Sequence, residues 1–189
     1  MTDLPTVEQL ETLTLRSIVA YAVRSARRAS VKLRGIVEAD VAETPLRIAE
    51  NLASMREFDR SGLPAVLFAA SAVAKVMTTL ETRDLKLAAL CLTRTAMSAS
   101  HVFRAVESLG VPLKAHYHAN FAAREAAPCA MDAADALGDV TPAPIDCAHS
   151  DYDILLKNFG RHQVVTLGEP VDFSEEWWRR EMLALESRS

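Results

Sequence analysis

Hydrophobic residues recur at spacings of three and four along most of the chain, which is the pattern of amphipathic helices. The clearest case is 15–34, LRSIVAYAVRSARRASVKLR, where a rotation of about 100° per residue collects apolar and small side chains on one arc. The opposite arc is basic, and no acidic residue occurs between Glu11 and Glu38. We therefore predict one helical rod over residues 6–34, with its apolar side packed inward and its basic face turned outward.

The same periodicity predicts a series of further helices. They are expected at about 45–60, 63–80, 83–109, 116–137, 151–159 and 175–186. No alternating pattern of the kind that forms a sheet accompanies them; the stretch 163–167 could be extended, but a single strand cannot form a sheet. The predicted fold class is all-α: a single compact bundle of about six to seven helices, with residues 1–189 forming one domain.

Several boundaries follow from local signals. A capping box that begins at Thr6 should start the first rod. Pro45 is predicted as the first residue of the second helix, and Pro128 should interrupt or kink the helix that contains it. Ser150 or Asp151 is predicted to cap the short helix that follows.

Composition supports a helical protein with a tightly packed interior. Half of the 189 residues are hydrophobic, only six are glycine, and alanine is plentiful, which favours helix. A chain of this length is long enough for one sizeable core. Because alanine on inward faces lets helix axes approach closely, we expect little internal space for a ligand, and no cofactor.

Charge is unevenly distributed along the chain although the net charge is only −4, which is not the basic balance typical of nucleic-acid binding. Between Arg124 and Lys157 the chain has no basic residue but carries Glu125, Asp132, Asp135, Asp139, Asp146, Asp151 and Asp153. The simplest interpretation is that this acidic stretch compensates the basic rod inside the fold. If all the arginines of the rod were paired in this way, its basic face would have no role outside the chain.

The three cysteines are an odd number and have no C-x-x-C spacing. This favours reduced thiols in the cytoplasm over a disulfide framework or a zinc site. The first residues lack the apolar core of a signal peptide. The most apolar run, residues 63–76, is shorter than the roughly 20 residues that cross a bilayer, so no membrane insertion is expected.

Candidate catalytic and metal-binding residues form no complete set. His116 and His118 diverge by about 200° on a helix and so cannot share a metal ion. Asp132, Asp135 and Asp139 fall on one helical stripe that could hold Mg²⁺, although a solvated acidic face explains them more simply. A further group near a predicted cap comprises His149, Asp151 and Asp153.

Motifs for nucleophilic catalysis and for phosphate or dinucleotide binding are also missing, namely G-x-S-x-G, G-x-x-x-x-G-K and G-x-G-x-x-G. The sequence therefore predicts no metal site. The alternative that stays open is a metal-dependent enzyme with a carboxylate and histidine site within residues 116–153.

The remaining functional candidates are surfaces. The basic face, with Arg24, Arg27, Arg28 and Lys32, suits an anionic partner, a nucleic acid or a lipid surface. No helix-turn-helix or stacking aromatic accompanies it, so nucleic acid is not favoured, and its alanine-rich apolar side lacks membrane anchors. Trp177 covers the preceding loop or anchors a partner. We expect a soluble bundle that binds a protein partner or itself, as an interaction or scaffold module without catalytic activity.

Two stretches resemble a known group of proteins. They are IVAYAVRSARRASVKLRG near the start and SDYDILLKNFGRHQVVTLGEPVDFSEEWW near the end. They are similar to the ends of a large group of uncharacterised, Ala-rich, all-helical bacterial proteins, which close with D-Y-x-x-L-L and then L-G-x-P-[IV]-D-P-S-E. The matching residues are Asp151, Tyr152, Leu155, Leu156, Leu167, Gly168, Pro170, Val171, Asp172, Ser174 and Glu175. Phe173 and Trp177–Trp178 depart from that pattern. The resemblance implies an all-helical fold and transfers no site.

Overall fold

The chain folds into a bundle of helices, as a computed structural model that describes residues 4–55, 61–138, 143–162 and 164–186 shows. Within these ranges there are eight α-helices and one short 3₁₀ turn. They are α1 (Val7–Glu11), α2 (Leu15–Ser30), the 3₁₀ turn η1 (Val31–Leu33), α3 (Ala39–Ser54), α4 (Gly62–Met77), α5 (Arg83–Glu107), α6 (Pro112–Leu137), α7 (Pro144–Phe159) and α8 (Glu175–Glu186). No strand occurs in the described ranges, which confirms the predicted all-α class.

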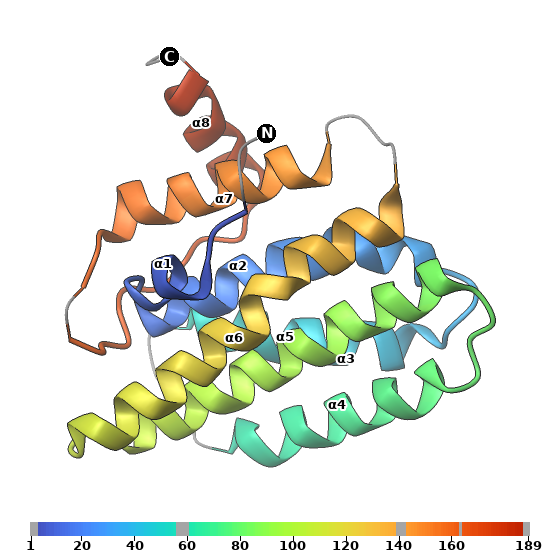
Figure 1. Ribbon diagram of the computed structural model, residues 1–189, viewed down its shortest axis with the longest axis horizontal. Coiled ribbons are helices and arrows are strands. Elements are labelled where there is room, and N and C mark those ends of the chain that lie inside the picture. Colours follow the sequence, from blue (N-terminus) through green and yellow to red (C-terminus); the bar gives the residue numbers. More distant parts are fainter. Residues whose placement is uncertain (1–3, 56–60, 139–142, 163, 187–189) are drawn as a thin grey trace.

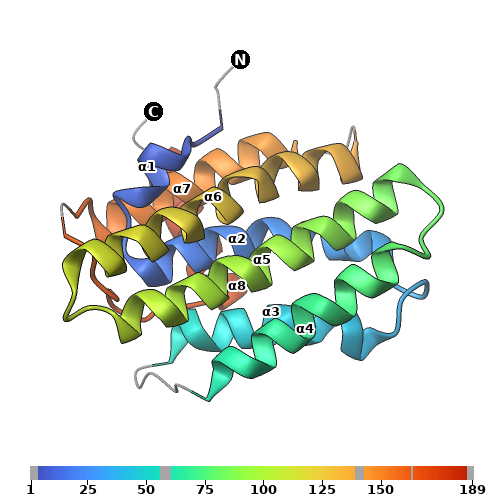
Figure 2. The ribbon, with the colours of Figure 1, turned by 60° about the horizontal axis from the view of Figure 1, so that its bottom comes forward.

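Helix α2 is the centre of the bundle rather than one of its surface helices. It packs against α3, α5, α6 and α7, and 13 of its 16 residues are buried. The long helices α5 and α6 form an antiparallel hairpin on one side of it; Figure 2 shows α3 and α4 along the lower edge, and Figure 1 shows α7 and α8 beyond α6. Since α2 is covered on several sides, its basic residues must find partners on neighbouring helices.

The predicted single rod over residues 6–34 is wrong, because the chain breaks between Glu11 and Leu15. The capping box at Thr6 is present, with Thr6 N–H donating to Gln9 Oε1 at 2.8 Å, but it begins only the five-residue α1. Thr14 then caps a new helix by accepting from the backbone N–H of Ser17 at 3.2 Å. A threonine that can bond nearby backbone groups ends one helix and begins another more readily than it continues a single one.

At three other places the helix is longer than the local signal indicates: the predicted start at Pro45, the predicted cap at Ser150 or Asp151 and the predicted interruption at Pro128 are wrong, whereas a kink at Pro128 stays a prediction. Helix α3 begins at Ala39, six residues before Pro45, and the added turns bury Ala42 in the core. Helix α6 runs without interruption through Pro128. Helix α7 begins at Pro144, so Asp151 lies in the middle of the helix, where it is buried, and does not cap it. In each region burial of the inward face outweighs the weak preference of one residue for a helix end.

The segment between α7 and α8, which we call the strap (residues 161–171, described except for residue 163), is hydrogen-bonded to the start of α2 and to the end of α3. Its carbonyls at Thr166 and Leu167 accept from the first backbone N–H groups of α2, at Leu15 and Arg16, over 3.0 and 3.1 Å. Two further bonds join His162 N–H to Thr12 O at 2.7 Å and Val171 N–H to Ala53 O at 2.9 Å. The strap thereby satisfies helix-terminal groups that would otherwise need solvent.

Arg16 reinforces the strap from inside the bundle. Its side chain donates to the carbonyl oxygen of Gly168 at 2.7 Å and also to that of Met55 at the end of α3. Gly168 itself has φ +80°, and a Cβ at this position would overlap the side chain of Thr14. The strap therefore passes the start of α2 at a distance that only glycine permits.

Small side chains bring α5 and α6 close together, as the alanine content predicted. The thiol of Cys91 on α5 lies 3.3 Å from the carbonyl oxygen of Cys129 on α6. Both thiols are free, and burial raises the pKa of Cys91 well above its usual value. No described helix combines the length and the apolar character that a bilayer crossing requires.

Candidate interaction surface

The basic face of α2 is not turned outward, because two of its arginines converge on one buried carboxylate. Arg24 Nε lies 3.5 Å from Asp151 Oδ1, and Arg28 Nη1 lies 2.6 Å from Asp151 Oδ2. The side chain of Asp151 is only 1% exposed, whereas those of Arg24 and Arg28 are 21% and 20% exposed. A carboxylate enclosed to this degree persists in a fold only when it is paired.

The surroundings of this cluster explain how α7 and α8 are held against α2. Burial alone would lower the pKa of Arg28, but the charge and hydrogen bonding of Asp151 raise it above its ordinary value. Arg24 also covers the face of Trp178 on α8, with its guanidinium carbon 4.4 Å from the ring centroid, and reaches to 4.0 Å from Glu175. A cation above an indole ring adds attraction to the ion pair. Arg24 thus binds both α7 and α8.

The other two residues of the predicted basic face differ from each other. Arg27 pairs with two acids of α3: its Nε donates to Glu50 at 2.7 Å, and its Nη1 contacts Glu43. The hydrogen bond to Glu50 is the largest cause of the raised pKa of Arg27. Lys32 is half-buried in the 3₁₀ turn and forms no ion pair within the part of the chain that the structure describes.

The prediction of an outward basic face is therefore wrong for Arg24, Arg27 and Arg28. The interpretation that the late acidic stretch compensates this face inside the fold is confirmed for Asp151 alone among the described residues of that stretch, because Glu125, Asp132 and Asp135 pair with arginines of α5. The acids that pair with Arg27 come instead from α3. This leaves the basic face of α2 little free charge for a partner.

Trp177 covers the protein's own structure. Its ring packs edge-on against Trp178, with centroids 4.8 Å apart, and lies 6.4 Å from the ring of Phe159 at the end of α7. The ring is half-buried, so it closes the junction of α7 and α8. The ring contacts of Trp177 are thus with α7 and with its own helix, whereas a cover over the preceding loop and a partner anchor both stay predictions.

The alternative carboxylate and histidine site in residues 116–153 is divided between separate places. Asp132 pairs with Arg94 at 2.9 Å, and Asp135 pairs with Arg83 at 3.2 Å, so arginines neutralise both carboxylates. Burial raises the pKa of Asp132, and Arg94 acts against that rise. Asp139 lies outside the described residues. Among the residues that are described, no group of three or more His, Cys, Asp or Glu is placed to hold a metal ion.

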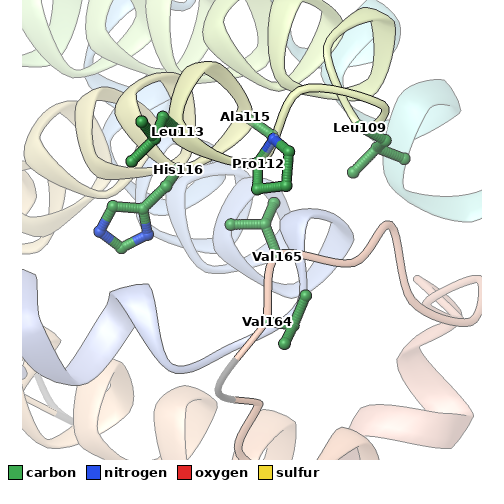
Figure 3. Close-up of a pocket in the computed structure, with 7 residues that line it drawn as sticks. All are labelled: Leu109, Pro112, Leu113, Ala115, His116, Val164 and Val165. Carbon is green, nitrogen blue, oxygen red and sulfur yellow. The ribbon is translucent and has the colours of Figure 1, made fainter.

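An apolar groove lies where the start of α6 meets the strap. The groove has a volume of about 280 Å³, and six of its seven lining side chains are apolar. The lining residues are Leu109, Pro112, Leu113, Ala115, His116, Val164 and Val165. Figure 3 shows Val165 directed towards Pro112, with Leu113 and His116 along the α6 side and Val164 on the outer side of the strap.

Exposed apolar side chains are concentrated around this groove. Leu113 is 87% exposed and Val164 76% exposed, the first on α6 and the second on the strap. Three of the ten exposed large hydrophobic residues in the described part of the chain line the groove: Leu109, Leu113 and Val164. Scattered exposed leucines are ordinary, but a contiguous apolar patch marks an interaction surface.

The sequence contains a signal for this surface that periodicity alone does not reveal. The turn between α5 and α6 reads S-L-G-V-P-L-K, in which three large apolar residues stand beside Gly110 and Pro112. Turns are ordinarily polar, so several exposed apolar residues in a turn are unfavourable and indicate a functional surface. The second half of the groove comes from the strap, which is distant in sequence and could not be located without the fold.

Comparison of the chain with protein-family models, with curated proteins and with solved structures found no match, so the resemblance to Ala-rich bacterial proteins stays a prediction.

Proposed function

We propose that this protein is an interaction module that binds an apolar segment of another protein in the groove between α6 and the strap. The observation that carries the proposal is the concentration of exposed apolar side chains around a concave site. The basic face of α2 and Trp177, which the sequence suggested as partner surfaces, contribute little to this proposal because their side chains contact other helices of the same chain.

The dimensions of the groove suit side chains of a peptide better than a larger ligand. Pockets for drug-sized molecules have volumes of roughly 300–1,000 Å³. The groove, at about 280 Å³, lies just below that range and is open to solvent on its outer side. An amphipathic segment that places its apolar face in the groove would cover Leu113 and Val164 together, in the manner of helix-in-groove recognition.

The rigid elements beside the groove favour binding without rearrangement. One wall belongs to α6, and the other is held to α2 by the backbone hydrogen bonds from Thr166 and Leu167. A surface already fixed in its bound shape loses little conformational entropy when a partner binds. We also propose a cytoplasmic setting, which the three free cysteines support.

A photo-reactive amino acid placed at position 113 in the living cell tests the proposal directly. We expect one discrete cross-linked product with a different protein at position 113 and none at position 68. Phe68 is a matched control because it is 78% exposed and apolar but belongs to α4, which contributes no residue to the lining of the groove. The product should disappear when Val164→Asp is added.

Two outcomes would overturn the proposal. Equal cross-linking at positions 113 and 68 would show general stickiness of exposed apolar residues. A product twice the mass of this chain, together with a dimer that Leu113→Asp dissociates in sedimentation experiments, would assign the groove to a second copy of the chain instead.

A further inference from the structure

Four basic side chains gather on the outer edge of the α5–α6 hairpin, on a different flank of α6 from the groove. His101 and His118 face each other across the two helices, with ring centroids 5.8 Å apart. Arg104 follows His101 by three residues, and Lys114 precedes His118 by four, so each lies one turn away on the same helix face. His118 is about 200° around α6 from the groove residue His116. We call these four residues the hairpin cluster.

No carboxylate neutralises the hairpin cluster within the described part of the chain. Arg104 and Lys114 form no ion pair there, in contrast to Arg83 and Arg94 farther down the same helix, which pair with Asp135 and Asp132. Along α5 and α6, the two acids nearest to the hairpin cluster in sequence are Glu107 and Glu125. Glu107 is exposed and forms no ion pair with Arg104, and Glu125 lies 3.9 Å from Arg94 instead.

The pKa values of the two histidines agree with a local excess of positive charge. Burial is the main cause that lowers the pKa of His101, followed by the charges of Arg104 and His118. Burial also lowers the pKa of His118, followed by Arg104 and Lys114. Both imidazoles are therefore neutral at pH 7, and the hairpin cluster carries two positive charges, from Arg104 and Lys114.

The position of the imidazole protons follows from the burial of one nitrogen in each ring. In both His101 and His118, Nδ1 is enclosed without a hydrogen-bond partner, which is not the case for Nε2. A buried N–H without an acceptor is rarer in folded proteins than a buried acceptor without a donor. The neutral rings therefore carry their proton on Nε2, which gives the cluster two neutral donors directed to solvent.

We propose that the hairpin cluster is a binding site for an oxyanion with two negative charges, a phosphate or sulfate group. Arg104 and Lys114 supply two charges that match a dianion, and the Nε2–H groups of His101 and His118 add two hydrogen bonds. Charge-assisted hydrogen bonds from arginine to such oxygens are among the strongest in proteins. The site is separate from the apolar groove and does not depend on the proposed function.

Calorimetric titration with sulfate at low ionic strength tests this site, since sulfate stays doubly charged across the working pH range. We expect saturable binding of one sulfate per chain, with an affinity about tenfold or more lower for Arg104→Gln. Arg83→Gln is the matched control: it removes an exposed arginine from the same helix, and its affinity should equal that of the wild type. Proton NMR should show the pKa of both His101 and His118 rising when sulfate is bound, because the anion stabilises the imidazolium.

The source of the anion is distinguished by comparing inorganic phosphate with phenyl phosphate. Tighter binding of phenyl phosphate identifies a phosphate monoester as the ligand, whereas binding of inorganic phosphate alone identifies the free anion; both support the site. The proposal is overturned if sulfate binding does not saturate, if chloride at equal ionic strength displaces it fully, or if Arg83→Gln weakens it as much as Arg104→Gln. Equal thermal midpoints of the two variants exclude misfolding as the cause.

Discussion

Replacement of Asp151 by asparagine would leave the guanidinium groups of Arg24 and Arg28 without their shared counter-charge while preserving the shape of the side chain. Removal of one partner from a buried ion pair costs about 3–5 kcal/mol, because an uncompensated charge stays inside the protein. The lower end applies here, since each arginine keeps about a fifth of its side chain exposed and can be partly solvated. We therefore expect Asp151→Asn to lower the free energy of unfolding by about 3 kcal/mol.

Urea unfolding followed by far-ultraviolet circular dichroism measures this change. For a chain of this length, 1 kcal/mol corresponds to roughly 2–4 °C, so the thermal midpoint should fall by about 6–12 °C. Arg28→Met in the Asp151→Asn background should recover part of the loss, because it removes a stranded charge. The double variant should be at least about 1 kcal/mol more stable than the sum of the two single effects predicts.

Two results would refute this reasoning. If Asp151→Asn lowered the free energy of unfolding by less than about 1 kcal/mol, the ion pairs of Asp151 with Arg24 and Arg28 would behave like exposed ones. Additive effects of Asp151→Asn and Arg28→Met would mean that the 2.6 Å contact between these residues carries no net coupling.

Other predictions concern single positions. Gly168→Ala should lower the free energy of unfolding, measured in urea, by at least about 2 kcal/mol, because the new Cβ would clash with Thr14 and the backbone φ of +80° is strained for alanine. Gly110→Ala is the control: a Cβ there meets no other atom, so the free energy of unfolding should stay within about 0.5 kcal/mol of the wild type. The pKa values of the two histidines in the hairpin cluster are lowered in the folded protein, so their contribution to stability is full above the ordinary pKa of about 6.5 and is lost as the pH falls through the folded values. The free energy of unfolding should therefore be lower at pH 5 than at pH 7.5, and this decrease should be smaller for His101→Gln than for the wild type. A thiol reagent should modify the half-buried Cys147 in the native protein and reach Cys91 only on unfolding; modification of both at equal rates would contradict the raised pKa and full burial of Cys91.

The sequence predicted those parts of the fold that depend on neighbouring residues. The capping box at Thr6 is a local device and is present, and the predicted start of a helix at Arg83 and the predicted end of one at Leu137 match α5 and α6. Local signals also explain why the sequence wrongly predicts a helix cap at Asp151, which lies inside α7. An aspartate beside a serine resembles a helix cap, and only the fold reveals that its partners are arginines in a helix more than 120 residues earlier.

For the candidate surfaces too, features within one helix are predictable from the sequence, whereas contacts between distant segments are not. Amphipathic periodicity identified the arginines of α2 correctly as one face, but it could not indicate that α3 and α7 cover this face. The groove is not predictable from periodicity because Val164 and Leu113 belong to segments about 50 residues apart in the sequence, and hydrogen bonds of the strap to α2 hold the later segment in place. Periodicity reports which side of a helix is apolar; it does not report which exposed residues of different elements become neighbours.

The strap also bears on the order in which the chain folds. Arg16 and Gly168, joined by a hydrogen bond, are 152 residues apart. A hairpin such as α5–α6 closes early on the ribosome because its halves are adjacent, whereas the start of α2 lacks its partners until the strap has been synthesised. A newly made chain therefore carries its central helix with one end unpaired while the 152 residues between Arg16 and Gly168 are being added.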